Sequence, residues 1–240
     1  MTEMPWSGDA EATACNFAFG HRVRNLKIFL TREGRIHAET LLAASGAIAG
    51  FAAQRALMAR LAADPDPASV RGLHIVTTAA GEKFLFGDPL NDALMAKRDG
   101  EASEKVFSLA AGAAVQLGLP ASQLPAQGAL FTHVATVLGG EDEGWPSVEA
   151  KHRPAAPTKA VLDAVWPFAS SIFDGRVPGR DGAYGVAPQR WRPAIAAWCT
   201  NVHIRDVASM LDPLRAYTIV VESAIYASKV DAGRVNTALR

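Results

Sequence analysis

The residues best suited to binding a charged ligand lie in an arginine- and glycine-rich segment, residues 174–192. Arginine binds a carboxylate or a phosphate through two parallel N–H groups. Closely spaced glycines would let such a loop close over a ligand. The pattern is typical of a solvated loop whose arginine stems cover the aromatic rings, and its alternative is a loop that binds an anion or another ligand. The candidate ligand-binding residues are Arg180, Tyr184, Arg190 and Arg192.

A second group of reactive side chains, Cys199, His203 and Asp206, falls on one expected helix. Spacings of four and three residues place them on a common face. A catalytic thiol needs a nearby base to form its thiolate. Side chains from one helix run parallel rather than converging, so we expect these residues to be structural, and His203 stays a candidate ligand-binding residue.

His133 lies in a stretch without charged residues, 106–140. A single histidine on an apolar helix is either a hydrogen-bonded core residue or a polar group inside a pocket. His37 and Glu39 could contribute to a metal site with another helix, but the Glu-x-x-His pairs of helical bundles are not found. Asp88 is expected to cap a helix rather than bind a cation. We therefore expect no metal and no cofactor.

Stronger signatures of chemistry are missing from the sequence. It contains no dinucleotide-binding or phosphate-binding glycine loop, no nucleophile elbow and no HExxH pair. The 24 basic and 24 acidic residues balance, which argues against nucleic acid or an anionic membrane as a partner. Two cysteines make no disulfide framework, and residues 1–14 lack an apolar signal core. A cytoplasmic location is expected.

A long helix is predicted over residues 32–63, because good helix formers precede the break at Asp64-Pro65. Its middle, residues 40–54, carries no charge and must be buried on several sides. The uncharged stretch 106–140 is interrupted by prolines and glutamines. It therefore predicts two short buried helices rather than a membrane span.

Gly46 and Gly50 lie one turn apart inside the long helix. Each glycine costs about 1 kcal/mol relative to alanine in a helix interior, so something should offset that cost. Close packing of another helix of the same chain is one explanation. A homodimer contact and close approach of a ligand are the other two.

A β-hairpin is predicted over residues 73–78 and 82–86, because β-favouring residues flank a turn at Gly81. An isolated hairpin is marginal in water. It needs a helix beneath it, a third strand such as residues 26–30, or the hairpin of a second subunit. Residues 1–22 show little periodicity and are expected to form an arm.

Six further helices are expected after the hairpin, between residues 88 and 231. Thr158 and Asp212 are predicted N-caps, and residues 139–157 resemble a linker in their glycine, proline and charge content. The expected helices are 88–100, 103–117, 125–138, 158–173, 189–211 and 213–231.

Together these patterns predict an α+β fold that is predominantly helical, a multi-helix bundle with one antiparallel β-hairpin. A single domain, 1–240, is expected, with a possible subdivision into 24–139 and 158–240. The element order is typical of a conserved bacterial protein and implies no activity.

We expect a non-catalytic protein that binds a small ligand or a protein partner, and that forms a homodimer. The alternative is an enzyme acting on a small anionic substrate, with the arginine-rich loop as lid and His133 or His203 as acid/base. Such an enzyme needs a histidine, a carboxylate and two arginines converging on one point.

Overall fold

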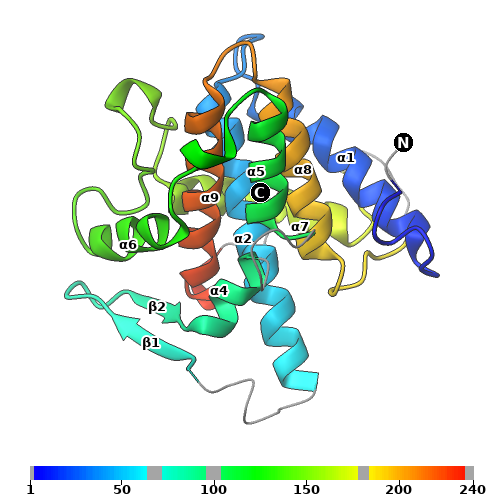
Figure 1. Ribbon diagram of the computed structural model, residues 1–240. Coiled ribbons are helices and arrows are strands. Elements are labelled where there is room, and N and C mark those ends of the chain that lie inside the picture. Colours follow the sequence, from blue (N-terminus) through cyan, green and yellow to red (C-terminus); the bar gives the residue numbers. More distant parts are fainter. Residues whose placement is uncertain (1–2, 64–71, 96–103, 178–183, 236–240) are drawn as a thin grey trace.

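One long helix, α2 (Ala38–Ala63), runs through the centre of the protein. The computed structural model describes residues 3–63, 72–95, 104–177 and 184–235. Around α2 pack α7 (Thr158–Phe173), α8 (Arg192–Asp206) and α9 (Pro213–Lys229), and α1 (Ala12–Leu30) lies outside α7 and α8 (Figure 1). The predicted fold class, a helical bundle with one hairpin, is confirmed.

The contact between α2 and α9 depends on the two glycines of α2. A Cβ atom added to Gly46 would lie 2.2 Å from the backbone oxygen of Val220, and one added to Gly50 would lie 1.9 Å from that of Ala224. No side chain fits there, so the two backbones approach directly. Internal helix packing is therefore what offsets the helix-breaking tendency of these glycines, and they do not form a dimer or ligand contact.

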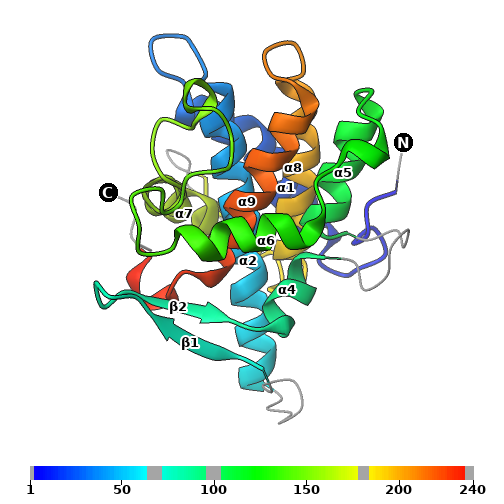
Figure 2. The same ribbon diagram turned by 60° about the vertical axis from the view of Figure 1, so that its left-hand side comes forward.

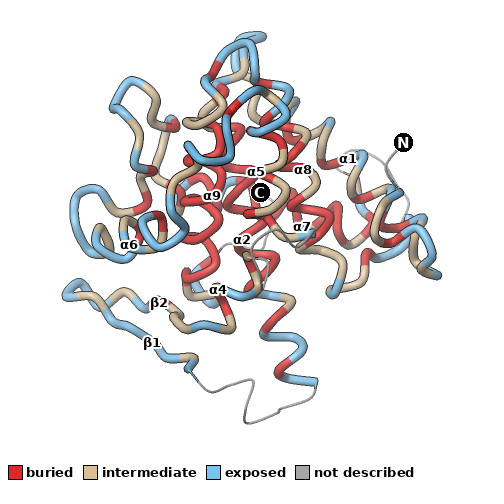
Figure 3. Tube along the Cα trace, viewed as in Figure 1, coloured by how far each residue is buried: buried red, intermediate tan, exposed pale blue. Residues whose placement is uncertain are grey.

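Gln54, one turn after Gly50, completes this contact. Its side-chain amide donates hydrogen bonds of 2.8 Å to the backbone oxygens of Ser228 and Val230. The last carbonyl groups of a helix lack partners within the helix. The buried amide of α2 therefore satisfies carbonyl groups at the C-terminal end of α9. Figure 3 shows that α2 and α9 are both buried over most of their length.

The N-terminal region differs from the prediction. Residues 12–30 form helix α1, so residues 12–22 are not an arm, and residues 26–30, which fit either a short strand or the start of a helix, are helical. Ala18 and Leu26 are fully buried. A turn with positive φ at Glu33 (51°) and Gly34 (73°) separates α1 from α2. The predicted helix start at residue 32 is therefore wrong, because the chain reverses there before α2 begins at Ala38.

The hairpin is confirmed and packs on the helices. Strands β1 (His74–Thr77) and β2 (Lys83–Phe86) pair antiparallel, with β2 on the helix side and β1 outside (Figure 2). Phe84 is buried, and its ring centre lies 5.9 Å from that of Tyr226 on α9. A helix beneath the hairpin thus supplies the support, and the third-strand alternative is wrong because residues 26–30 belong to α1.

Helix α4 (Asp88–Leu94) follows the hairpin, but Asp88 does not cap it. The N-cap is Gly87 at φ 139°, and the helix ends at Leu94 rather than near residue 100. Thr158 is likewise the first residue of α7, after the N-cap Pro157, and its hydroxyl donates to Ser223. Only the predicted cap at Asp212 is confirmed, because its carboxylate accepts from two backbone N–H groups.

Helices α5 (Val106–Gln116) and α6 (Gln127–Val137) cover α8 and α9. Short 3₁₀ helices, η1 (Ala121–Gln123), η2 (Ala150–His152) and η3 (Ala232–Arg234), lie in the connections. The segment that resembles a linker, 139–157, is tied to α9, because Glu222 accepts hydrogen bonds from Ser147. Buried apolar residues before and after this segment form one cluster.

By length and composition, α2 is the one helix of the described residues that would suit a membrane crossing. In its most apolar 18-residue window, 83% of the residues are buried inside the protein. A central core helix has the same features, and here other helices of the chain cover it.

The Gly50→Ala variant tests the close backbone approach. We expect it to lower the free energy of unfolding by about 3 kcal/mol or more, because the added methyl group overlaps backbone rather than a movable side chain. Urea unfolding measures this. The matched control is Gly112→Ala in α5, where an added Cβ meets nothing within 4 Å, and which should gain about 0.5–1 kcal/mol. Equal effects of the two variants would contradict the proposed packing role.

Candidate ligand-binding cleft

A cleft of about 790 Å³ lies between the second half of α2, helix α4 and the segment that leads into α8. We call it the α2–α4–α8 cleft. Its apolar lining includes Leu57 from α2, Ala93 from α4 and Ala194 from α8. Ligand-binding pockets of proteins measure about 300–1,000 Å³ and are mainly apolar with a few polar groups, so the cleft has the dimensions of a small-molecule site.

Charged side chains from three parts of the chain border this cleft. Arg60 comes from α2, Asp92 from α4 and Arg190 from the lead-in to α8, and Glu104 and Lys105 precede α5. Lys105 donates a hydrogen bond to the backbone oxygen of Asp92. The Glu104 carboxylate accepts a hydrogen bond from the indole of Trp198. Among the described residues, no ion pair engages Arg60.

Arg190 is held in place by the N-terminal segment. Its Nη2 lies 2.8 Å from Asp9 Oδ2 and 3.2 Å from Glu11 Oε2, and the neighbouring Trp191 donates to the same Asp9 oxygen at 2.7 Å. Hydrogen bonds with Glu11, Arg190 and Trp191 hold the pKa of Asp9 well below its usual range. Arg190, a candidate ligand-binding residue from the sequence, thus borders the cleft but shares its charge with two carboxylates.

The other residues of the arginine-rich segment do not join Arg190. Arg192 points between α7 and α8, pairs with Asp174 at 2.9 Å and lies 5.3 Å from the centre of the Phe173 ring. Tyr184 stacks on Phe17 of α1 with ring centres 4.2 Å apart. Arg180 lies outside the described residues. Where the segment is described, its side chains thus secure α8 to the rest of the protein.

His203 is a fully buried core residue. Its Nδ1 lies 2.9 Å from the Ser45 hydroxyl on α2, and its Nε2 lies 3.3 Å from the backbone oxygen of Val23. Burial lowers the pKa of His203 to about 4, so the ring is neutral at pH 7. Burial also raises the pKa of the Cys199 thiol to about 11. This pair therefore lacks both the thiolate and the accessible base that a nucleophilic site requires.

His133 lies on α6 and contacts the loop that precedes α7 rather than the cleft. Its Nε2 donates to the backbone oxygen of Trp145 at 3.0 Å and lies 3.9 Å from Glu222 Oε2. The hydroxyl of Ser147 donates to Glu222 at 2.6 Å. Serine thus contacts the carboxylate and not the imidazole, which differs from the order of an acyl-transfer triad.

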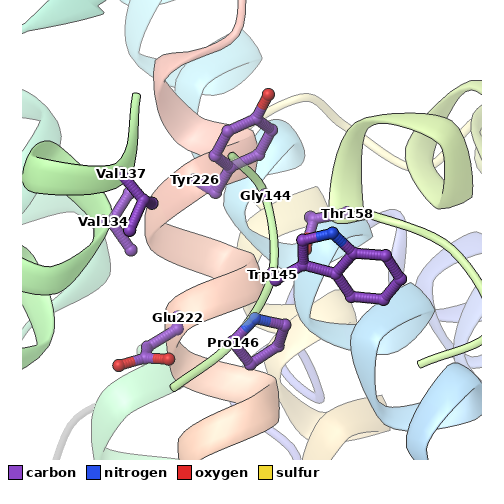
Figure 4. Close-up of a pocket in the computed structure, with 8 residues that line it drawn as sticks. All are labelled: Val134, Val137, Gly144, Trp145, Pro146, Thr158, Glu222 and Tyr226. Atoms are coloured by element: carbon purple, nitrogen blue, oxygen red, sulfur yellow. The ribbon is translucent and has the colours of Figure 1, made fainter. Parts of the chain in front are cut away.

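A small cavity of about 10 Å³ lies beside Glu222, between α6, α9 and the loop around Trp145 (Figure 4). This volume holds about one water molecule. Burial raises the pKa of Glu222 despite the hydrogen bonds from Ser147. Sequence reasoning missed Glu222, because a lone glutamate inside an apolar helix carries no spacing signal for its distant partner.

Lys229 is the second buried charge that sequence reasoning missed. Its Nζ lies 4.4 Å from the centre of the Phe86 ring, 5.6 Å from that of Phe131, and 3.4 Å from the side-chain oxygen of Asn91. Burial lowers the pKa of Lys229 to about 8. A lysine in the last turn of a helix is common for electrostatic reasons alone, so nothing in the sequence marked it.

No group of three or more histidine, cysteine, aspartate or glutamate side chains is arranged to hold a metal ion within the described part of the chain. Glu39 contacts His37 at 3.5 Å and His152 at 3.1 Å. The cross-helix partner of this pair is therefore His152, rather than the expected His133 or His203.

No protein-family model, curated protein or solved structure matches the chain.

The burial of His203 predicts a pH dependence of stability. Its folded pKa of about 4 lies below the usual 6.5, so the unfolded chain binds the proton more tightly. The contribution of neutral His203 to the free energy of unfolding is complete above about pH 6.5 and declines toward pH 4. By pH 4.5 it has fallen by about 2 kcal/mol. Urea unfolding from pH 7.5 to 4.5 measures this. The decline should be smaller in His203→Gln, and equal declines in both proteins would contradict the assignment.

Proposed function

We propose that this protein binds a small amphipathic anion without catalysis, in the α2–α4–α8 cleft. The observation that carries the proposal is a cleft of about 790 Å³ that combines an apolar lining with Arg60 and Arg190 from separate elements. A ligand with an apolar body and one carboxylate, sulfonate or phosphate group matches this combination. The apolar part would cover Leu57 and Ala93, and the anionic group would contact the arginines.

Arg60 is the main anion-binding group of the proposed site. It is exposed at the end of α2, and no ion pair with a described residue neutralises it. A guanidinium can hold an oxyanion through two parallel hydrogen bonds. Arg190 contributes less, because Asp9 and Glu11 already share its charge.

A non-catalytic role is favoured by the residues that border the cleft. An acid/base enzyme was expected to place a histidine beside a carboxylate and two arginines. The described lining has arginines and carboxylates but no histidine. His203 is engaged in the core and His133 contacts Trp145, so neither supports the enzyme alternative.

Binding of 8-anilinonaphthalene-1-sulfonate tests the proposal, because this probe joins aromatic rings to one sulfonate. We expect one saturable site, read from the probe's fluorescence. Arg60→Met should weaken binding roughly 10- to 100-fold, because it removes a charge-assisted hydrogen bond. Arg190→Met should weaken it less.

Two further variants separate the cleft from general surface binding. Ala56→Glu places a carboxylate on the cleft wall and should abolish binding by repulsion. Arg24→Met removes an exposed arginine of α1 outside the cleft and should leave the dissociation constant unchanged. An unchanged constant in both Arg60→Met and Ala56→Glu would refute the site.

A second candidate function is self-association through the hairpin. Ile75 and Val76 of β1 are 64% and 38% exposed, and β1 pairs only with β2 among the described residues. An outer strand with exposed apolar side chains can pair with the same strand of a second copy. The glycines of α2 no longer support a homodimer, so this proposal rests on the hairpin alone.

Light scattering coupled to size exclusion tests self-association. At micromolar concentration we expect twice the 25.4-kDa mass of the chain. Ile75→Lys should give the monomer mass, because it places a charge on the outer strand. Met210→Lys, at a residue that is 53% exposed before α9, is the control and should stay dimeric. A monomeric unmodified protein would rule out this interface.

A further inference from the structure

An unpaired positive charge is buried where α1 packs against α7 and α8. Arg22 of α1 is 0% exposed. Its three guanidinium nitrogens, Nε, Nη1 and Nη2, have no hydrogen-bond partner among the residues that the structure describes. Buried charges in proteins are normally paired with an opposite charge. The described side chains around Arg22 do not provide one.

The Phe173 ring that contacts Arg22 is also contacted by a second arginine. The guanidinium carbon of Arg22 lies 4.7 Å from the centre of the Phe173 ring, and that of Arg192 lies 5.3 Å from the same centre. Arg192 has acceptors of its own, the carboxylate of Asp174 and the backbone oxygen of Ala187. The Asp174 carboxylate beside this ring is therefore paired with Arg192. The Phe173 ring itself has no oxygen or nitrogen atom that could accept a hydrogen bond from Arg22.

The ionisable groups that face Arg22 from α8 are neutral. Burial raises the pKa of Cys199 to about 11 and lowers that of His203 to about 4. Burial also lowers the pKa of Arg22, but a guanidinium keeps its proton at neutral pH. Arg22 thus carries a full positive charge in the interior, and no described residue forms an ion pair with it.

We propose that Arg22 is the anchoring group of a buried site for one small monovalent anion, between α1, α7 and α8. Chloride and a small carboxylate share the required chemistry, a single negative charge that accepts hydrogen bonds from guanidinium N–H groups. Because Arg22 is fully buried, we expect the site to take a small ion rather than a bulky one. The site is separate from the α2–α4–α8 cleft, which Arg22 does not border.

Local movement of α1 gives such an ion a route to Arg22. Ion pairs near the two ends of α1 attach it to the α8 region, Lys27 with Asp206 at 2.8 Å and Glu11 with Arg190 at 3.2 Å. Exposed ion pairs of this kind stabilise only weakly. Buried residues of α1, Ala18 and Leu26 among them, hold the helix more firmly, so the ion reaches Arg22 through local opening of this outer helix.

Thermal unfolding at constant ionic strength tests the site. The melting temperature is measured in three sodium salts, the chloride, the acetate and the isethionate, whose bulkier sulfonate anion serves as the reference. We expect the melting temperature to rise by roughly 3–10 °C, with saturation, at 10 to 100 times the dissociation constant. The more effective of the two salts identifies the source of the anion. Arg22→Met keeps the length of the side chain without its charge, and should melt at the same temperature in all three salts.

The control is Arg24→Met, at an exposed arginine on the same helix, which should keep the anion-dependent shift.

A second measurement covers the case in which Arg22→Met does not fold. The ³⁵Cl line width should be broadened by the native protein, and acetate or urea unfolding should remove the broadening. Equal melting temperatures of the unmodified protein in all three salts, or a shift that persists in Arg22→Met, would overturn the proposal. Sulfonate probe binding in the cleft should stay unchanged in Arg22→Met, so the two proposals fail separately.

Discussion

The direct backbone contact between α2 and α9 is the constraint on which the rest of the structure depends. Any side chain at Gly46 or Gly50 would collide with a carbonyl oxygen of α9, so the two helices must approach closely over this turn. Together with α7 and α8, which cover its other faces, α9 buries α2 completely from Leu41 to Gln54. The contact between α2 and α9 also determines where α9 ends, because Gln54 binds the last carbonyl groups of that helix.

The candidate cleft is a consequence of this arrangement. Beyond Gln54, α2 extends past the tightly packed core, and residues such as Arg55 and Arg60 become exposed (Figure 1). Helix α4 and the lead-in to α8 flank this projecting part without closing around it. The cleft combines an apolar wall with charged residues because the second half of α2 projects beyond the packed core.

In the described part of the chain, buried ionisable side chains differ in whether they have partners. His203 contacts Ser45, Glu222 accepts hydrogen bonds from Ser147, and Lys229 lies between two phenyl rings. Each has contacts that offset part of its desolvation. Arg22 has a ring beside it but no hydrogen-bond acceptor. That difference is what singles out Arg22 as a group that needs an external ion.

The sequence by itself determined the features that local spacing encodes. The uncharged stretch of α2 required burial, the glycines one turn apart indicated close helix packing, and the β-rich runs around Gly81 predicted the hairpin. Only the tertiary structure decided which distant groups meet. Residues 12–30 are helical although their pattern was weak, because α7 and α8 cover their buried face. Arg190 pairs with Asp9, and Arg192 pairs with Asp174. The cleft joins α2 to the lead-in to α8, which are more than a hundred residues apart in the sequence. Periodicity reports which face of an element avoids water, but it carries no information about which other element covers that face.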